Sequence, residues 1–522
     1  FGVMGRGFGR MGAARTKGGG DAYIGIGRNH VFGPVTGSAS GTDTTGTSTK
    51  VYKAKGAVTK LKALVGNQRT GTGTVGAIEA DGYNVVPTNK LTIETPLAAT
   101  PVAMTKGGAA SFSLTATDAG AETEALIAAV ADQADIRVRM YTGVSSPDRF
   151  VLNSYLSDSR ESTNFASQSS GDGTDKTAVS GTFNNSGPSP LNGRVPMVLL
   201  GVAPGAKCLL LIGDSIGAGK GFNPTSSKKP TLHGCFDAGI TEGQINSINA
   251  AIAGATDIVF FGGSAASDTR TRRGLFRYAT DILDENGIND TLYRSTWQEM
   301  ASDKLAMAAL AGKRFWVTTI TPFVTTTDNC ITIANQTKSA RESKRTGYND
   351  WVRARCQVDG SGNPVASGGT TSPLILGYVD YAGAVEADNT NTLAVNGGYW
   401  KVPAAAALGP YTLTGTPTTT AFAIGSTPWT AGALTGQVIK MLTGARAGQV
   451  AVIANNTTSG LTLYANGSTT QSGIALVGLS GAPAAGDTFE IWDVYTNEGL
   501  HPAVAGHAAM AVKTAAFVSS IA

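Results

Sequence analysis

The pattern of hydrophobic and polar positions changes its character twice along the chain. From residue 21 to residue 204, short strand-like stretches such as KLTIETPL, SFSLTAT and ADIRVRMYTG alternate with turn residues. Strands at this spacing with polar turns predict an all-β domain, either a sandwich or a jelly roll. One helical segment is expected to interrupt this domain around residues 122–132.

A second pattern begins at Lys207, where apolar strand candidates alternate with helical stretches. The strand candidates are CLLLIG, DIVFFGG, RFWVTTIT and PLILGYVDY, and helices are expected near residues 241–253, 269–285, 295–311 and 348–357. Continuous apolar strands separated by helices specify βαβ units and a parallel sheet that is covered on both faces. The sequence therefore predicts an α/β domain that begins at residue 205.

The alternation stops near Tyr399, and short strands with Gly and Asn turns follow as far as residue 494. From Thr496 the chain returns to a loop and a final helix, HPAVAGHAAMAVKTAAFVSSI, with apolar residues at helical spacing. These changes predict a small all-β module, residues 399–494, inserted into an α/β domain that consists of residues 205–398 and 495–522.

Composition changes this picture mainly at the N-terminus. Charged residues make up 15% of the chain, below the roughly 25% usual in globular proteins, and 68 of its 522 residues are glycine. The formal net charge is +4, and residues 1–20 hold Arg6, Arg10, Arg15 and Lys17 with no acid. This Gly/Arg arm accounts for the whole excess charge and is expected to be flexible unless it docks on a partner. We expect no nucleic-acid partner, because the rest of the chain is neutral, and no membrane partner, because no apolar run of about 18 residues occurs.

The stretch LLLIGDSIGAG carries the first candidate chemistry, a serine at the end of a predicted parallel strand. A phosphate-binding loop would need glycine at 214 and Ser or Thr at 221, where the chain has Asp214 and Gly221, so this interpretation is rejected. Two interpretations remain open on these residues alone. One is the G-x-S-x-G nucleophile elbow of α/β-hydrolases, and the other is a serine hydrolase of the Gly-Asp-Ser type.

A serine nucleophile needs a base, and the chain has four histidines. His30 lies in the β region, His233 lies in a polar loop, and His507 lies within the last helix as an expected packing or capping residue. His501 stands in the turn Asn-Glu-Gly-Leu-His-Pro, three residues after Glu498. A carboxylate at this spacing can accept the Nδ1–H of the imidazole while Nε2 takes the serine proton. We expect no metal site and no cofactor, since no second cluster of ligands accompanies this turn.

Two glycine-containing loops could supply oxyanion donors: FFGGSAAS, with Gly263, and DENGINDT, with Asn289. In this order, Gly-Asp-Ser at 213–215, Gly263, Gly-Ile-Asn-Asp at 287–290 and the terminal His-Pro turn resemble the SGNH (GDSL) hydrolase superfamily. The resemblance covers the α/β part of the chain.

The resemblance implies a flavodoxin-like three-layer α/β/α fold for the α/β domain. It also implies Ser215 as nucleophile, His501 as base, and an oxyanion hole formed by the Ser215 amide, Gly263 and Asn289. The chain departs from the family pattern at Glu498, where the family usually has Asp, and in the inserted β module.

The β regions and the arm weakly resemble modules of phage virion proteins. By that analogy we expect an esterase that removes acyl groups, such as acetyl, from a bacterial surface polysaccharide. We further expect a virion or extracellular location, a homo-oligomer, and contact with virion proteins through residues 1–20. The alternative is a structural or receptor-binding virion protein that keeps the SGNH fold without needing catalysis. The four cysteines are too few and too scattered for a disulfide scaffold or a zinc site.

Overall fold

The computed structural model covers the full chain, and most of it can be described in detail. The described residues are 21–31, 45–66, 68–73, 76–81, 87–115, 120–144, 154–156, 162–163, 173–178, 191–193, 195–220, 234–260, 270–387, 397–469 and 474–522. The N-terminal arm, Gly263 and His233 lie outside these ranges.

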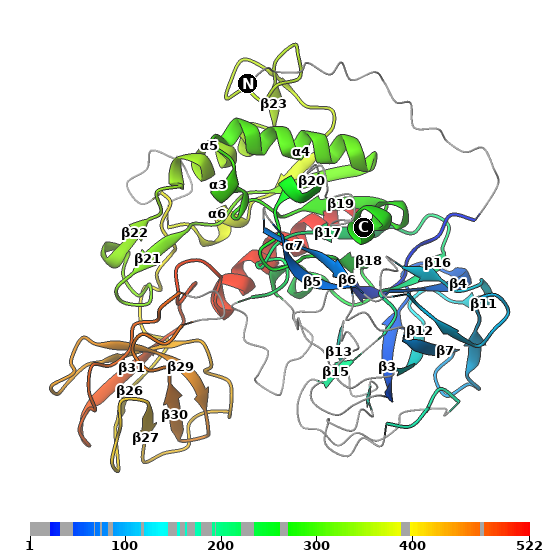
Figure 1. Ribbon diagram of the computed structural model, residues 1–522. Coiled ribbons are helices and arrows are strands. Elements are labelled where there is room, and N and C mark those ends of the chain that lie inside the picture. The colour runs from blue at the N-terminus through cyan, green and yellow to red at the C-terminus, as the bar shows by residue number, and fades with distance from the viewer. Residues whose placement is uncertain are drawn as a thin grey trace.

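The centre of the molecule is a six-stranded sheet in which every neighbouring pair of strands is parallel (Figure 1). Its strands, in spatial order, are β2 (Arg28–His30), β18 (Asn246–Asn249), β17 (Cys208–Ile212), β19 (Asp281–Asp284), β20 (Arg314–Thr318) and β25 (Gly377–Val379). Counted from β17, the order is 2-1-3-4-5 with β2 added at one edge, which is a doubly wound arrangement. All five side chains of β17 are fully buried, as its unbroken apolar sequence requires.

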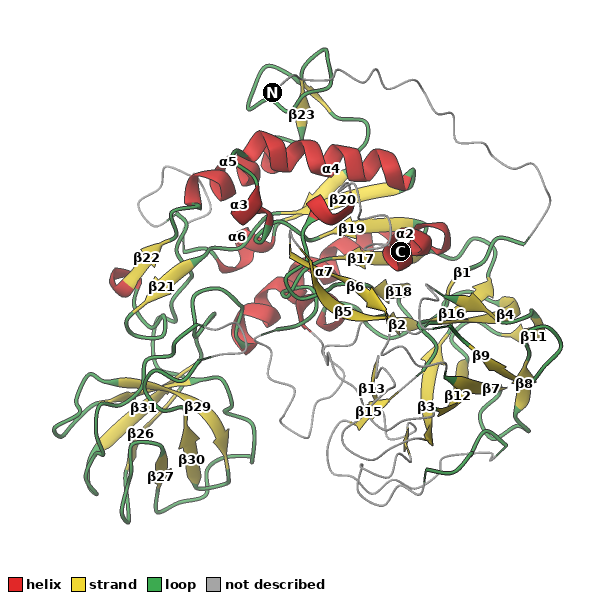
Figure 2. Ribbon diagram, viewed as in Figure 1, coloured by secondary structure: helices red, strands yellow, loops and turns green. Residues whose placement is uncertain are grey.

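Helices cover this sheet in two groups, as Figure 2 shows. Helices α4 (Trp297–Ala311) and α5 (Glu342–Arg353) pack together on one side. Helices α1 (Gly234–Ala238) and α6 (Tyr381–Val385) pack against α7 (Val504–Ile521) on the other. The result is a mixed α/β domain with three layers. Helix α7 is long and apolar enough to cross a membrane by length and composition, but here it is a covering helix of the sheet.

The short elements around the sheet complete this domain. They are η1 (Asp257–Phe260), α2 (Arg270–Leu275), η2 (Phe276–Tyr278), α3 (Asp290–Tyr293), β21 (Val324–Thr326), η3 (Ile333–Asn335), β22 (Gln336–Lys338), β23 (Gln357–Val358) and β24 (Thr370–Thr371). Strands β21 and β22 form an antiparallel hairpin.

The N-terminal region forms antiparallel sheets, as its alternating pattern predicts. A five-stranded sheet contains β1 (Ile24–Gly25), β16 (Val198–Val202), β4 (Val58–Val65), β10 (Ala121–Glu122) and β11 (Leu126–Val130). A six-stranded sheet contains β14 (Ser162–Thr163), β3 (Thr45–Lys53), β12 (Asp135–Gly143), β7 (Thr88–Glu94), β8 (Val102–Met104) and β9 (Ser111–Ser113). Two pairs stand apart: β5 (Gln68–Gly73) with β6 (Gly76–Asp81), and β13 (Ser154–Leu156) with β15 (Leu191–Gly193).

One strand crosses from this region into the α/β domain. Strand β2 pairs in parallel with β18, so three residues within the predicted 21–204 range belong to the central sheet. A division of the chain by sequence ranges alone therefore separates residues that share one sheet.

The predicted inserted module is a six-stranded antiparallel sheet with a core of its own. Its strands, in spatial order, are β26 (Leu408–Thr412), β31 (Thr488–Trp492), β28 (Val438–Met441), β29 (Val450–Asn456), β30 (Gly460–Leu463) and β27 (Ala421–Ala423). One apolar cluster, including Ile439, Ile453 and Phe489, lies within the module. A second cluster joins Val438 and Val452 of the module to Ile331 of the α/β domain. Figure 1 shows the module beside hairpin β21–β22.

Four local predictions were wrong because tertiary pairing overrides helix or strand propensity. The helix predicted near 269–285 is wrong over residues 281–284, which form the central strand β19 between β17 and β20. Residues 122–132 form no helix, since β10 and β11 pair with β4. The helix predicted at 241–253 is replaced by β18, whose four side chains are all buried between neighbouring strands. In the strand predicted from DIVFFGG, residues 257–260 form the 3₁₀ turn η1 instead, and residues 261–263 lie outside the described ranges. The 295–311 prediction is confirmed by α4, which begins at a Thr296–Glu299 capping box.

Candidate active site

Ser215 lies in the tight turn that follows β17, and the flanking glycines make room for a buried acid. A Cβ atom added at Gly213 would lie 2.5 Å from a Glu285 carboxylate oxygen, and one added at Gly217 would lie 2.7 Å from it. That oxygen accepts the backbone N–H groups of Asp214 at 3.0 Å and Gly217 at 3.1 Å. Gly213 and Gly217 are therefore required, because the carboxylate of Glu285, the residue directly after β19, lies against the turn of Ser215.

The three predicted catalytic side chains meet although they are far apart in sequence. His501 Nε2 lies 2.8 Å from Ser215 Oγ. His501 Nδ1 is paired with Glu498 Oε1, which also accepts the backbone N–H of His501 at 3.2 Å. Ser215 is 6% exposed, and His501 and Glu498 are each 4% exposed. The extra methylene of Glu498, relative to Asp, does not prevent its carboxylate from reaching the imidazole.

This arrangement is that of a nucleophile, a base and an orienting acid. The carboxylate selects the tautomer that carries the proton on Nδ1, which leaves Nε2 free to accept the proton of Ser215. Among the described residues, no group of three or more His, Cys, Asp or Glu side chains could hold a metal ion.

The turn that carries His501 is fixed by bonds within itself and to a hairpin. Thr496 Oγ1 donates to the carbonyl of His501 at 2.7 Å and accepts the N–H of Gly499 at 3.0 Å. Gly499 has a φ of +85°, and a Cβ atom there would lie 2.2 Å from the carbonyl oxygen of Val324. In return, the N–H of Val324 donates to the carbonyl of Gly499 at 3.0 Å. Only glycine fits this position.

A second support for the same turn comes from Trp400, which was not predicted. Its indole N–H donates to the carbonyl of Gly499 at 2.9 Å, and the Trp400 side chain is fully buried. The backbone N–H of Trp400 donates to Gln336 Oε1 at 2.9 Å. Trp400 lies at the start of the predicted module range, residues 399–494, so this junction contacts the histidine turn directly.

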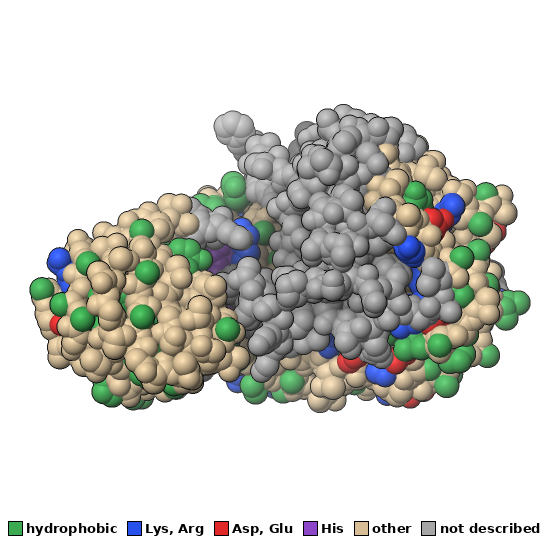
Figure 3. Space-filling model, turned by 90° about the horizontal axis from the view of Figure 1, so that it is seen from below, with side chains coloured by type: hydrophobic (Ala, Val, Ile, Leu, Met, Phe, Trp, Pro, Cys, Tyr) green, Lys and Arg blue, Asp and Glu red, His purple; other side chains and the backbone are tan. Residues whose placement is uncertain are grey.

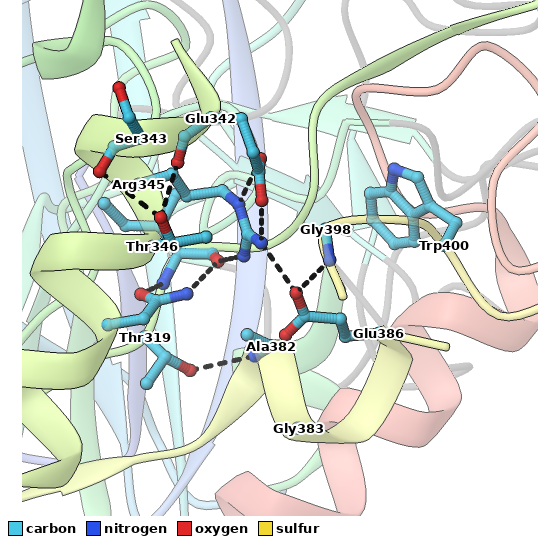
Figure 4. Close-up of polar contacts among 12 residues, drawn as sticks. Thr319, Glu342, Ser343, Arg345, Thr346, Ala382, Gly383, Glu386, Gly398 and Trp400 are labelled. Atoms are coloured by element: carbon cyan, nitrogen blue, oxygen red, sulfur yellow. Dashed lines mark hydrogen bonds and ion pairs between the residues drawn. The ribbon is translucent and has the colours of Figure 1, made fainter. Parts of the chain in front are cut away.

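Figure 4 shows how the segment that leads to Trp400 is anchored. The N–H of Gly398 donates to Glu386 Oε1 at 2.6 Å, and the same carboxylate oxygen pairs with Arg345 at 2.6 Å. Arg345 is fully buried and also pairs with Glu342 at 2.6 Å. Burial disfavours its charge, but the two carboxylates raise the pKa of Arg345 above its usual value. This ion-pair network fixes the backbone of Gly398, two residues before Trp400, beside helices α5 and α6.

Asn289 lies beside the same site, at the start of α3. Its Nδ2 donates to the carbonyl of Ala255 at 3.1 Å. The segment after β18 runs alongside the turn of Ser215, since the N–H of Ile252 donates to the carbonyl of Gly213 at 2.9 Å. The structure therefore brings the Asn289 loop, the 252–255 turn and the Ser215 turn to one edge of the sheet.

Within the 252–255 turn, Gly254 has a φ of +85°, a conformation that favours glycine. Its position between the Ser215 and Asn289 loops makes it a candidate oxyanion donor that was not predicted. The sequence carries a signal for this turn, Ala-Ala-Ile-Ala-Gly directly after β18, but its residue pattern predicts a helix over 241–253. Gly263 lies outside the described residues, so its predicted role stays a prediction.

A group of buried charges lies behind these loops. Lys304 of α4 pairs with Asp257 at 2.8 Å and with Asp284 at 2.8 Å, and it donates to the carbonyl of Asn286 at 2.6 Å. Asp290, the residue after Asn289, accepts the N–H of Asp257 at 2.9 Å. Burial raises the pKa of Asp284 above its ordinary value, and the nearby Asp257 raises it further. One ammonium group thus ties the loop of Asn289 to η1 and to α4.

The other described histidines have structural roles. His507 Nδ1 accepts the N–H of Cys235 at 3.0 Å, and His507 Nε2 contacts the carbonyl of Lys220 at 2.9 Å. Burial lowers the pKa of His507 to about 4, so its predicted packing role is confirmed. His30 pairs with Asp237 at 3.1 Å. Seen from below, a histidine surface is visible beside the inserted module, with basic and hydrophobic side chains next to it (Figure 3).

Comparisons with known proteins find only weak similarity to solved structures. No family model matches the chain, and no curated protein matches it. A solved structure described as a lipolytic protein of the G-D-S-L family, from Desulfitobacterium hafniense DCB-2, has 12% identity and a TM-score of 0.23, covering 37% of this chain and 91% of that one. LAE5, an α/β hydrolase enzyme from the metagenome of Lake Arreo, Spain, has 17% identity and a TM-score of 0.21, covering 34% and 78%.

An acetyl xylan esterase from Geobacillus stearothermophilus has 14% identity and a TM-score of 0.16, covering 31% of this chain and 88% of that one. Likenesses at these scores establish neither a family nor an activity for this chain. The case for a function rests on the geometry of the site.

Proposed function

We propose that the protein is a serine esterase of the SGNH type. The observation that carries the proposal is the contact between Ser215 and His501, with Glu498 on the opposite nitrogen of the imidazole. The strand order 2-1-3-4-5 of the central sheet, which is that of flavodoxin-like folds, also supports it.

In the proposed reaction, Ser215 Oγ attacks the acyl carbonyl while His501 Nε2 takes the serine proton. Glu498 stabilises the imidazolium that forms. The alcohol then leaves with the proton from His501, and the acyl group stays on Ser215 as an ester. A water molecule, deprotonated by His501, attacks this ester and releases the carboxylic acid.

The oxyanion of each tetrahedral intermediate needs N–H donors that are fixed before the reaction. We propose the backbone N–H of Ser215, the amide of Asn289 and the backbone N–H of Gly254 for this role. The bond from Asn289 to Ala255 supports the choice, because it fixes the amide group beside the turn of Gly254. Gly263 is the alternative that the family resemblance implies.

The test is hydrolysis of 4-nitrophenyl acetate by the Ser215→Ala variant. We expect kcat/KM to fall at least about 10⁴-fold with the fold intact. Ser302→Ala, an exposed serine on α4, is the matched control and should hydrolyse like the parent. Equal activity of the Ser215→Ala variant and the parent contradicts the proposal.

As the setting, we further propose deacylation of a bacterial surface polysaccharide by a homo-oligomer that belongs to a phage particle, with residues 1–20 docked on other virion proteins. Acetate release from O-acetylated bacterial glycans tests the substrate. Tight glycan binding without acetate release favours the alternative, a receptor-binding virion protein that does not need catalysis.

A further inference from the structure

The loop that follows β20 lies between the two loops that carry Asn289 and His501. On one side, a Cβ atom added at Gly287 would lie 2.7 Å from the side chain of Ile320, so this loop packs on the Asn289 loop. On the other side, Val324 bonds to the carbonyl of Gly499 in the histidine turn. Phe323, the neighbour of Val324, is thereby held at the carboxyl edge of the sheet, where ligands of doubly wound folds bind.

Apolar and aromatic side chains with open surface lie on the elements next to this loop. Tyr293 and Leu292, at the end of α3, are 43% and 49% exposed. Phe323, Tyr399 and Leu500 are half-buried against the core of the α/β domain. Lys344 fixes α3 in place, because its ammonium donates to the carbonyls of Thr291 at 3.0 Å and Arg294 at 2.7 Å. The rings of Tyr293 and Phe323 therefore lie on segments that hydrogen bonds hold in place.

Two cations lie on these rings. The guanidinium of Arg341 lies 5.5 Å from the centre of the Phe323 ring. Tyr293 lies near enough to Arg341 for the two side chains to interact electrostatically. The ammonium of Lys338 lies 4.6 Å from the centre of the Tyr399 ring. Within the described ranges neither cation forms an ion pair. The adjacent acid, Glu342, is engaged by Arg345.

We propose that these five residues, Tyr293, Phe323, Lys338, Arg341 and Tyr399, form a subsite for a carboxylate-bearing sugar unit next to the acylated unit. We call them the aromatic–cation patch. Ring faces pack on the apolar face of a sugar, while a guanidinium holds a carboxylate in a bidentate geometry and an ammonium adds a second charge. The inference rests on the proposed esterase function and makes the substrate an acidic O-acylated glycan.

Binding to the Ser215→Ala protein tests the patch without turnover. In calorimetric titrations, oligogalacturonate should bind about tenfold more tightly than a neutral xylo-oligosaccharide of equal length, and added salt should weaken its binding. Arg341→Gln, in the same background, should remove most of that preference. Lys338→Gln should remove a smaller part, since an ammonium makes no bidentate contact.

The chain offers matched controls at the opposite edge of the sheet. Arg355, just beyond the other end of α5, and Lys313, just before β20, each carry the same charge as their counterparts. Arg355→Gln and Lys313→Gln should bind oligogalacturonate like the Ser215→Ala parent. A thermal melt of each variant identifies any that fails to fold.

The outcomes separate this inference from the proposed function. The patch is contradicted if Arg341→Gln and Lys338→Gln keep full affinity, if the neutral glycan binds equally well, or if phosphatidylglycerol vesicles bind and oligogalacturonate does not. Hydrolysis of 4-nitrophenyl acetate depends on Ser215 and not on Arg341. If Ser215→Ala loses ester hydrolysis but binds oligogalacturonate no more tightly than the neutral glycan, the subsite is rejected and the esterase proposal stands.

Discussion

The two turns that form the Ser215–His501 pair are supported in different ways. The turn of Ser215 is held from within the α/β domain, by the Glu285 carboxylate below it and by Asn249 Nδ2, which donates to the carbonyl of Gly217 at 3.1 Å. The turn of His501 is held by elements outside the sheet, namely Val324 of hairpin β21–β22 and Trp400 at the junction of the inserted module. The position of Ser215 thus depends on the core of the sheet, and the position of His501 depends on elements at its periphery.

This difference predicts two kinds of variant. Changes beneath the Ser215 turn should lower the free energy of unfolding, because they leave buried polar groups without partners. Changes around the His501 turn should lower kcat while the fold persists, because the imidazole would shift relative to Ser215. Four variants test this division, in order of decreasing effect.

The largest effect is expected at Glu498, which contacts the imidazole itself. Glu498→Gln keeps the shape of the side chain but removes the charge that stabilises the imidazolium, so kcat should fall by about 10²- to 10⁴-fold. Steady-state hydrolysis of 4-nitrophenyl acetate measures this loss. Glu498→Asp is the matched control, which retains the charge and should keep more activity than Gln. A Gln variant as active as the parent would remove Glu498 from the site.

At the Ser215 turn, Glu285→Ala should act mainly on stability. The N–H groups of Asp214 and Gly217 would lose their acceptor, at a cost of about 2–4 kcal/mol in the free energy of unfolding. Burial and the neighbouring Asp214 raise the pKa of Glu285 well above its usual value, so neutral Gln is a close replacement. Urea denaturation should therefore give a much lower free energy of unfolding for Glu285→Ala than for Glu285→Gln. Equal stability of both variants would show that Glu285 does not support the turn.

His507 should make the support of the Ser215 turn sensitive to acid. Its pKa in the folded protein is about 4, below the value near 6.5 expected when unfolded, so the unfolded chain binds the proton first. The contribution of neutral His507 to the free energy of unfolding is complete above pH 6.5. It is lost as the pH falls toward 4, and the total loss is about 3 kcal/mol. His507→Gln, which can still accept from Cys235 and donate to Lys220, should flatten this loss in melts between pH 7 and pH 4. An unchanged slope argues against the assignment.

The smallest effect is expected at Trp400. Trp400→Phe removes the N–H that holds the carbonyl of Gly499, and kcat should fall about tenfold with KM little changed. Trp429→Phe is the matched control, because Trp429 is buried in the core of the module and its indole N–H has no hydrogen-bond partner among the residues that the structure describes. If both variants lose kcat equally, the effect is general destabilisation and not the position of the histidine turn.

The sequence predicted those parts of the site that are encoded locally. Glu498 and His501 lie on one turn, and Ser215 lies directly after an apolar strand, so short motifs suffice to find them. Helix α4 was also predictable, since its capping box marks where it begins.

Features that depend on distant pairing were not predictable in this way. Strand β18 contains two asparagines, Asn246 and Asn249, whose side-chain NH₂ groups donate to other segments, so its sequence does not look like a buried strand. Missing β18 concealed Gly254, and nothing near Arg28–His30 indicates that this strand would join a sheet formed by residues beyond 205. Trp400 contacts Gly499 across 99 positions of sequence, which no local pattern records.

The most direct test of the central claim is labelling with a fluorophosphonate probe, followed by peptide mapping. The account predicts one covalent adduct on Ser215, no adduct in Ser215→Ala, and much slower labelling in His501→Ala, because the hydroxyl needs its base. Labelling of a different serine, or equal labelling in the parent and the His501→Ala variant, would contradict the assignment of Ser215 and His501 as nucleophile and base.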